Sequence, residues 1–137
     1  MNIYFCGSIR GGRDLAKTYE KIIMMLGNYG KVLTEHLGSD EKIESKDRIL
    51  TDKEIHDRDL QWIVDSDMVV AEVTMPSLGV GYEIGRAIEM GKPVFCFFQP
   101  DKGYTLSAMI AGSDKVIMNV YRDIEELKSL FDSFFDS

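Results

Sequence analysis

Along most of the chain, short and nearly continuous apolar runs alternate with longer segments in which apolar residues recur at helical spacing. The apolar runs predict five strands, within Asn2–Gly7, Tyr29–Thr34, Asp67–Val73, Pro93–Phe98 and Lys115–Val120. The periodic segments predict helices between Gly12 and about Asn28, from Thr51 to about Asp65, from the turn at 76–81 to Gly91, over Thr105–Ala111, and from Asp123 to about Asp136. Strands that alternate with helices favour the α/β class, with a parallel sheet covered by helices on both faces.

Length and composition limit the classes of protein and partner. The chain has 137 residues, which fits one domain that spans residues 1–137. Hydrophobic residues make up 45% and charged residues 28% of the chain, as in ordinary globular domains. A net charge of -7 argues against a nucleic-acid polymer or an anionic membrane as partner. A small phosphorylated ligand remains compatible with this charge, because it needs only a local group of donors.

The cysteines and histidines do not form a metal-binding pattern. Cys6 and Cys96 each lie in a predicted strand, and the chain has no Cys-x-x-Cys motif. His36 and His56 have no ligand spacing that a metal site would require. Two isolated cysteines in strands indicate reduced core thiols and a cytoplasmic setting.

A glycine-rich turn follows the third predicted strand and leads into a helix. Ser77, Gly79 and Gly81 lie in this turn, where free backbone N–H groups can point at an anion. We place Glu83 in the first turn of the helix, whose positive dipole end favours the ionised carboxylate. The glycine spacing does not match the dinucleotide-binding fingerprint, and the Gly-Lys-Ser/Thr of a P-loop is missing. The alternative is an ordinary glycine-rich joint with no catalytic role.

The turn after the first predicted strand has similar chemistry. It contains Ser8, Arg10 and Gly11. Glycine lets the backbone approach a ligand closely, and arginine supplies charge and forked donors. The alternative is a plain turn with a surface arginine. Because ligands of parallel α/β sheets bind beyond the carboxyl ends of the strands, both turns are candidate walls of one site.

Asp59 interrupts the apolar stripe of the helix that begins near Thr51. Ile55, Trp62 and Ile63 fall at helical spacing on the same face. A carboxylate on a core-facing stripe is costly unless another group pairs with it or a reaction uses it. The alternative is that Asp59 lies at the edge of the stripe, in water.

Two carboxyl groups in different environments suit the cleavage of a glycosidic bond. In a nucleotide, an ionised Glu83 could attack the sugar carbon that carries the base, while a protonated Asp59 donates a proton to the departing base. A retaining reaction of this kind needs carboxyl groups about 5–5.5 Å apart. Loss of the 2-hydroxyl destabilises an oxocarbenium-like state less, which favours a deoxyribose substrate.

Five segments in the same order resemble the 2'-deoxynucleoside 5'-phosphate N-hydrolases of the Rcl type, within the nucleoside 2-deoxyribosyltransferase superfamily. The segments are Tyr4–Gly12, Gly30–His36, Ile55–Trp62, Val69–Glu83 and Leu106–Ile110. The resemblance covers nearly the whole chain and implies a flavodoxin-like, doubly wound sheet. It also implies hydrolysis of 2'-deoxynucleoside 5'-monophosphates to a free base and 2-deoxyribose 5-phosphate, with no metal or cofactor. The charged segment from Leu37 to Leu50 departs from the family pattern.

The resemblance also implies roles for individual residues. Glu83 would be the nucleophile that forms a covalent deoxyribosyl intermediate, Asp59 the acid/base residue, and Tyr4 a contact of the sugar. The residues expected to line the nucleotide and 5'-phosphate site are Ser8, Ile9, Arg10, Gly11, Ser77 and Gly79. A homodimer is expected, in which Ser107 and Met109 complete the site of the neighbouring copy.

Three other functions fit parts of the same sequence pattern. A nucleoside 2-deoxyribosyltransferase would pass the deoxyribose to a second base, although its substrates lack the phosphate that the Ser-and-Arg turn suits. A ribonucleoside monophosphate N-glycosidase would have to place a 2-hydroxyl against Tyr4. A non-enzymatic flavodoxin-like module, such as a receiver domain, is disfavoured. It needs acidic residues after the first strand, where this chain has Gly7 and Ser8.

Overall fold

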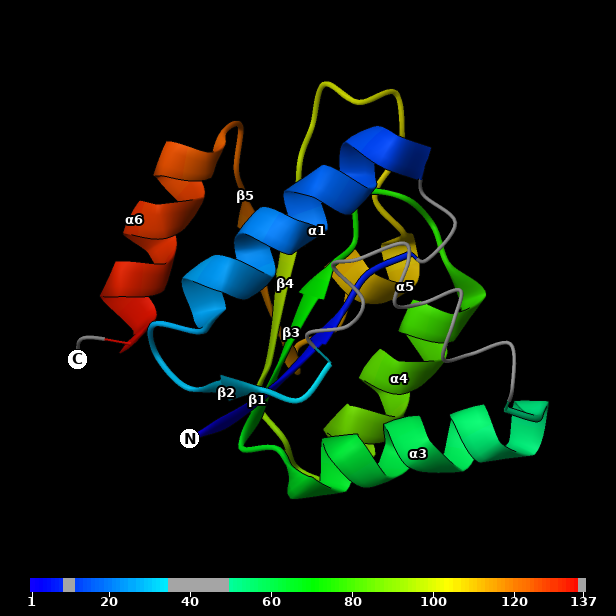
Figure 1. Cartoon of the computed structure of the whole chain (residues 1–137). Helices are drawn as coiled ribbons and strands as arrows, with labels where there is room; N and C mark the ends of the chain where they lie inside the picture. The colour runs from blue at the N-terminus through cyan, green and yellow to red at the C-terminus, as the bar shows by residue number, and fades with distance from the viewer. Residues whose placement is uncertain (9–11, 35–49, 136–137) are drawn as a thin grey trace.

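The computed structural model describes residues 1–8, 12–34 and 50–135, in which five strands form one sheet (Figure 1). The strands are β1 (Asn2–Cys6), β2 (Lys31–Val32), β3 (Met68–Glu72), β4 (Val94–Phe98) and β5 (Val116–Val120). All neighbours pair in parallel, in the order β2-β1-β3-β4-β5, which is the flavodoxin-like order. The predicted five-stranded parallel sheet is therefore confirmed.

The helices divide between the two faces of the sheet. One face is covered by α1 (Gly12–Leu26) and α6 (Ile124–Phe135), and the other by α3 (Asp52–Asp65), α4 (Leu78–Glu89) and the short α5 (Ala108–Ala111) (Figure 1). Successive residues of a strand point to opposite faces. Ile3 and Phe5 of β1 therefore pack with α1 and α6, whereas Tyr4 and Cys6 pack with α3 and α4.

Local sequence signals set the helix ends that border the site. Thr51 caps α3 in a capping box: its hydroxyl accepts the Glu54 N–H, and the Glu54 carboxyl group accepts the Thr51 N–H. At its C-terminal end, α4 stops at Glu89, slightly earlier than the predicted end at Gly91. Gly91 has a positive φ of 76°, the left-handed conformation that follows many helix ends.

The strand order reverses between β1 and β3. β2 pairs with one side of β1 and β3 with the other, so the connections after β1 and β3 leave toward opposite faces (Figure 1). Ligands of such sheets bind at this switch point, beyond the carboxyl ends of the strands. Cys6 at the end of β1 is in register with Ala71 near the end of β3, which brings both predicted anion-binding turns to one edge.

Cys6 and Cys96 are free thiols buried in the core between the sheet and α3–α4, which confirms their prediction as core residues. None of the helices in the described part of the chain combines the length and the apolar character that a membrane crossing requires. The charged segment from Leu37 to Leu50 lies, apart from Leu50 itself, outside the described residues.

Candidate active site

The hydroxyl of Tyr4 meets the carboxyl group of Glu83 on the α3–α4 face of the sheet. Tyr4 lies in the middle of β1, and its side chain is buried. Its hydroxyl donates a hydrogen bond to Oε2 of Glu83, which is 79 positions later in the chain. Burial, followed by the negative charges of Glu83 and Asp59, raises the pKa of Tyr4. The hydroxyl therefore stays protonated and acts as a donor.

Glu83 lies in the second turn of α4, so the predicted position in the first turn is wrong. The helix begins at Leu78, and its first turn contains no acidic residue. The helix dipole acts mainly within the first turn, and desolvation prevails at Glu83. Burial raises the pKa of Glu83 from 4.5 to about 7, with the Tyr4 hydrogen bond lowering it and the Asp59 charge raising it. At neutral pH the group is divided between its two forms, whereas the predicted position in the first turn implied an anion.

Asp59 reaches the same site from α3. Its side chain is 25% exposed, and its Oδ1 lies 3.0 Å from Nη2 of Arg58. Nε of Arg58 donates to the same oxygen at 3.0 Å, and the guanidinium lies over the Trp62 ring, 4.7 Å from its centroid. Asp59 thus lies at the edge of the apolar stripe, which was the alternative to a core-facing position. It is paired with Arg58, however, and is not only solvated.

Asp59 and Glu83 line one hollow of about 210 Å³ between α3 and the start of α4. Its lining residues are Asp52, Ile55, His56, Asp59, Leu60, Gly79, Tyr82 and Glu83. His56 and Tyr82 were not predicted as site residues, because they are 26 positions apart and no local pattern connects them. In the structure, His56 Nε2 lies 2.8 Å from the Tyr82 hydroxyl, to which Arg86 Nη1 donates at 2.5 Å.

Two predicted anion-binding residues lie at the N-terminus of α4. Ser77 is the N-cap of the helix, and its Oγ accepts the Val80 N–H at 3.3 Å. Gly79 lies in the first turn and lines the hollow of Glu83. The first N–H groups of a helix lack intrahelical partners and attract anions. This helix end is therefore a candidate anion site next to the carboxyl groups.

The turn after β1 is described only in part. Ser8 is buried at the end of β1, and its N–H donates to the Tyr19 hydroxyl at 3.1 Å. The other predicted residues of this turn, Ile9, Arg10 and Gly11, lie outside the described residues.

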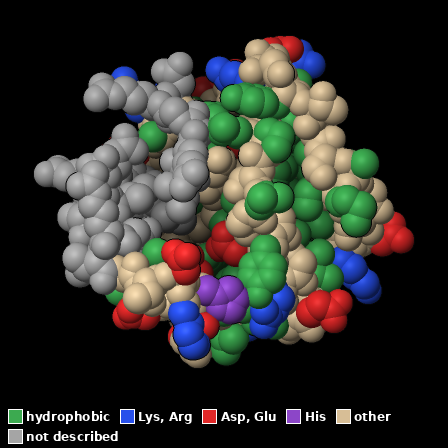
Figure 2. Space-filling view, turned by 90° about the vertical axis from the view of Figure 1, so that its right-hand side faces the viewer, with side chains coloured by type: hydrophobic (Ala, Val, Ile, Leu, Met, Phe, Trp, Pro, Cys, Tyr) green, Lys and Arg blue, Asp and Glu red, His purple; other side chains and the backbone are tan. Residues whose placement is uncertain are grey.

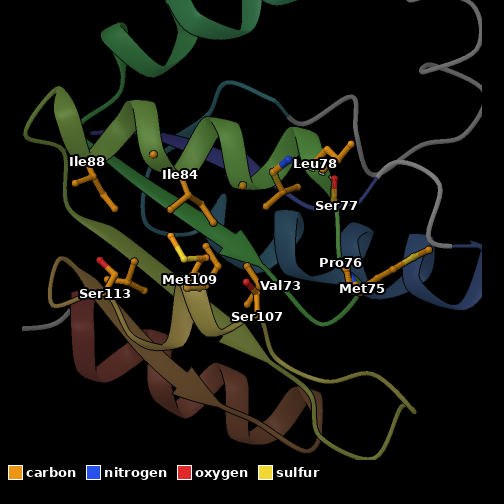
Figure 3. A pocket seen from close by; sticks show the side chains of 15 residues that line it. Val73, Met75, Pro76, Ser77, Leu78, Ile84, Ile88, Ser107, Met109 and Ser113 are labelled. Carbon is orange, nitrogen blue, oxygen red and sulfur yellow. Dashed lines mark hydrogen bonds between the residues drawn. The ribbon is translucent and has the colours of Figure 1, made fainter.

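Ser77 also borders a larger apolar groove of about 580 Å³ between α4 and α5 (Figure 3). Ser107 and Met109 line this groove, and Met109 points from α5 toward α4 (Figure 3). Leu78 is 97% exposed and Met109 84% exposed, and hydrophobic side chains form a band on this face (Figure 2). Within one copy, Ser107 and Met109 thus lie beside Ser77 and are absent from the lining of the hollow that contains Glu83.

The site combines three chemical capabilities. An ionised carboxylate such as Glu83 can act as a nucleophile, a second carboxyl group such as Asp59 can exchange a proton, and a helix N-terminus can bind an anion. Within residues 1–8, 12–34 and 50–135, no group of three or more His, Cys, Asp or Glu side chains is placed to hold a metal ion. The described side chains thus offer acid, base, nucleophile and anion-binding groups.

Comparison with known sequences matches the chain to one family. A profile of the nucleoside 2-deoxyribosyltransferase family matches residues 3–126. The chain is 49% identical over 140 residues to the 5-hydroxymethyl-dUMP N-hydrolase of Tetraodon nigroviridis, with 100% of this chain and 99% of that protein covered. It is 45% identical over 138 residues to the protein of the same name in Homo sapiens, with 98% and 79% covered.

Comparison with solved structures supports the fold. The CMP N-glycosidase BcmB of Clostridium botulinum matches with a TM-score of 0.71 and 17% identity, covering 98% of this chain and 99% of that chain. A 2-desoxiribosyltransferase from Leishmania mexicana matches with a TM-score of 0.56 and 14% identity, covering 98% and 97%. At these identities, the likeness extends to the fold alone.

Proposed function

Because the chain belongs to the nucleoside 2-deoxyribosyltransferase family, we propose that it hydrolyses the N-glycosidic bond of 2'-deoxynucleoside 5'-monophosphates. The products are a free base and 2-deoxyribose 5-phosphate. The observation that carries the proposal is the hydrogen bond from Tyr4 to Glu83, together with the hollow that Glu83 lines with Asp59. Relatives that align with nearly the whole chain bear the name of a hydrolase for one such nucleotide, 5-hydroxymethyl-dUMP, which supports the substrate class.

In the first proposed step, the ionised Glu83 carboxylate attacks C1' of the deoxyribose. The bond between C1' and the base nitrogen breaks, its electron pair leaves with the base, and the base takes a proton from Asp59. The Tyr4 hydrogen bond lowers the pKa of Glu83 and so favours the attacking form. A covalent deoxyribosyl-Glu83 intermediate results.

In the second step, a water molecule attacks C1' on the face that the base has left. The Asp59 carboxylate takes a proton from the water, the bond between C1' and Glu83 breaks, and the configuration at C1' is retained. The Arg58 guanidinium, 3.0 Å from Asp59 Oδ1, holds this carboxyl group in place for both proton transfers. A second base in place of water would give deoxyribosyl transfer, so the two activities differ only in the acceptor.

The 5'-phosphate is proposed to bind between the N-terminus of α4 and the turn after β1. Ser77 uses a lone pair of its Oγ to cap the helix, so its hydroxyl hydrogen can still be donated to a phosphate oxygen. The helix N–H groups near Gly79 and the helix dipole favour the dianion. The proposed contacts from the turn after β1 are Ser8, Ile9, Arg10 and Gly11.

Two copies are proposed to associate through the face formed by α4 and α5. In one copy, the apolar groove with the exposed Leu78 and Met109 faces water, which is unusual for a surface without a partner. A second copy on this face would place its own Ser107 and Met109 near Ser77 of the first, as the family resemblance implies. The free thiols of the chain support a cytoplasmic setting for this dimer.

Chromatography tests the proposed activity. The purified protein is incubated with each common 2'-deoxynucleoside 5'-monophosphate, with 5-hydroxymethyl-dUMP and with the matching ribonucleotides. We expect free base and 2-deoxyribose 5-phosphate from the wild type and no product from Glu83→Ala. A new nucleotide that forms only when a second base is added would instead identify a deoxyribosyltransferase. Equal turnover of ribonucleotides would contradict the deoxyribose assignment, and the absence of any base release would overturn the hydrolase.

Analytical ultracentrifugation tests the proposed dimer. Met109→Glu places a charge in the apolar groove and should give monomers with reduced turnover. Met24→Glu is the matched control, because Met24 is 71% exposed on α1, on the opposite face of the sheet. It should leave both the mass and the activity unchanged. A fully active wild-type monomer would contradict the dimer without affecting the proposed chemistry.

A further inference from the structure

A buried carboxyl group that the proposed chemistry does not use lies at the end of the central strand. Glu72 is the last residue of β3, and its side chain faces the α1–α6 side of the sheet, away from Glu83. It is 1% exposed. A carboxyl group in such a position is destabilising unless several donors satisfy it, so its partners indicate its purpose.

Glu72 receives hydrogen bonds from the loop that follows β3 and from the residue that follows β5. Its Oε1 accepts the Thr74 N–H at 2.7 Å, and its Oε2 accepts the Thr74 hydroxyl at 2.9 Å. The Tyr121 hydroxyl, from the residue after β5, donates to the same Oε2. Thr74 and Tyr121 are themselves fully buried. The carboxyl group therefore closes a turn of three residues and connects it to the end of the edge strand β5.

Thr74 passes this connection on to the neighbouring strand. Its Oγ1 accepts the Gln99 N–H at 2.8 Å, just after β4. Its hydroxyl hydrogen is donated to Glu72, so both functions of the hydroxyl are in use. One hydrogen-bond network thus holds the carboxyl ends of β3 and β4 and the residue after β5. From Thr74 the chain continues to Ser77 and α4 (Figure 3).

The turn after β1 is supported from the same buried region. The Tyr19 hydroxyl accepts the Ser8 N–H at 3.1 Å. Tyr19 packs in the same core cluster as Tyr121, whose hydroxyl donates to Glu72. Both loops that carry the proposed phosphate contacts therefore rest on the same buried polar cluster, defined here as Tyr19, Glu72, Thr74 and Tyr121.

We infer that Glu72 is a positioning residue for phosphate recognition. It holds Thr74, so that the loop after β3 presents Ser77 and the N-terminus of α4 to the 5'-phosphate. The inference rests on the proposed function. Glu72 does not contact the substrate, because its side chain lies on the face of the sheet opposite to Glu83. Its effect is therefore expected on the binding of the phosphate and not on the chemical step.

Glu72→Gln is the first test, because it keeps the shape of the side chain. The amide nitrogen that replaces one oxygen can only donate. The Thr74 N–H loses its acceptor if the nitrogen replaces Oε1, and the hydroxyl hydrogens of Thr74 and Tyr121 lose theirs if it replaces Oε2. We expect KM for a deoxynucleoside monophosphate and the inhibition constant of inorganic phosphate to rise together, by about tenfold, with kcat within about twofold of the wild type. A residue that only stabilised the fold would lower the melting temperature without moving these constants.

Two further variants separate loop positioning from a general loss of stability. Thr74→Val removes the hydroxyl but keeps the branched shape, and should reproduce the KM effect, whereas Thr74→Ser should restore wild-type values. Tyr121→Phe removes a donor from the same Glu72 oxygen but leaves both contacts to Thr74. It should lower stability and leave KM within about twofold, since the loop keeps its hydrogen bonds.

Each result either supports or overturns the inference. Unchanged phosphate constants in folded Glu72→Gln would overturn it while the hydrolase stands. Equal KM increases in Glu72→Gln and Tyr121→Phe would also overturn it, because the effect would then belong to the whole cluster. If Glu72→Gln and Thr74→Val both failed to fold, the pair would be a requirement of folding and the positioning role would be rejected. If the wild type did not turn over monophosphates, the proposed function would fall, while protection by inorganic phosphate against unfolding would still test the loop.

Discussion

Replacing Tyr4 with phenylalanine removes a single hydroxyl and keeps the buried ring. That hydroxyl donates to Oε2 of Glu83. Burial raises the pKa of Glu83 to about 7, and the Tyr4 hydrogen bond acts against this rise. Without the donor, the ionised carboxylate loses a partner, whereas the protonated carboxyl group loses much less. We therefore expect Tyr4→Phe to raise the pKa of Glu83 further.

The size of the effect follows from the strength of this contact. A hydrogen bond to a charged group contributes about 1.5–3 kcal/mol, and about 1.4 kcal/mol corresponds to one pKa unit. The pKa of Glu83 should therefore rise by about one to two units from its value of about 7. At pH 7 the ionised fraction would fall from about one half to between about 1% and 10%, and kcat/KM would fall about 5- to 50-fold.

The assay is the pH profile of kcat/KM, which reports the groups of the free enzyme. The wild-type profile should rise with pH through about 7, because ionised Glu83 is the nucleophile. The Tyr4→Phe profile should rise about one to two units later and recover most of the loss in alkaline solution. Tyr82→Phe is the matched control. It removes the hydroxyl that contacts His56 and Arg86 in the hollow lined by Glu83, and its profile should not shift. A pH-independent loss in Tyr4→Phe would refute the reasoning, since Tyr4 would then not control the pKa of Glu83.

Three further substitutions test the site. Glu83→Gln should abolish turnover yet raise the melting temperature at pH 8. The pKa of Glu83 is about 7 in the folded protein, above the ordinary 4.5. The wild type therefore loses up to about 3 kcal/mol of unfolding free energy as the pH rises from the ordinary to the folded pKa. Near pH 4.5 this loss is absent, so the higher melting temperature of Glu83→Gln should vanish there. Asp59→Asn should slow base release most for poor leaving groups, in steady-state kinetics with several bases. A uniform, small effect would make Asp59 structural. Ser77→Ala should lower stability by about 1 kcal/mol and raise KM for monophosphates, but not for bare deoxynucleosides. Asp123→Ala is the control, because it removes a similar contact, to the Glu126 N–H at the start of α6. It should lower stability and leave KM unchanged. A KM increase in this variant would show that KM follows stability, which would contradict the phosphate role of Ser77.

Local signals accounted for most of the secondary structure. The apolar run at Asn2–Gly7 became β1 because both faces of a central parallel strand are buried. Thr51 and Glu54 marked the start of α3 because a capping box involves only neighbours in the chain. The misplacement of Glu83 by one turn was avoidable. Ser77 is a favoured N-cap residue, and counting from it places Glu83 in the second turn.

The sequence by itself determined the class of the sheet, the two turns suited to an anion and the two candidate carboxyl groups, since periodicity, glycine placement and family resemblance are readable along the chain. Only the tertiary structure decided how those groups behave. The hydrogen bond between Tyr4 and Glu83 spans 79 positions, and the one between Tyr121 and Glu72 spans 49. A pKa depends on desolvation and on whichever charges and donors lie nearby. Tertiary packing determines both the desolvation and the neighbouring groups. The sequence therefore shows which residues the chain contains, and the fold decides which of them come into contact.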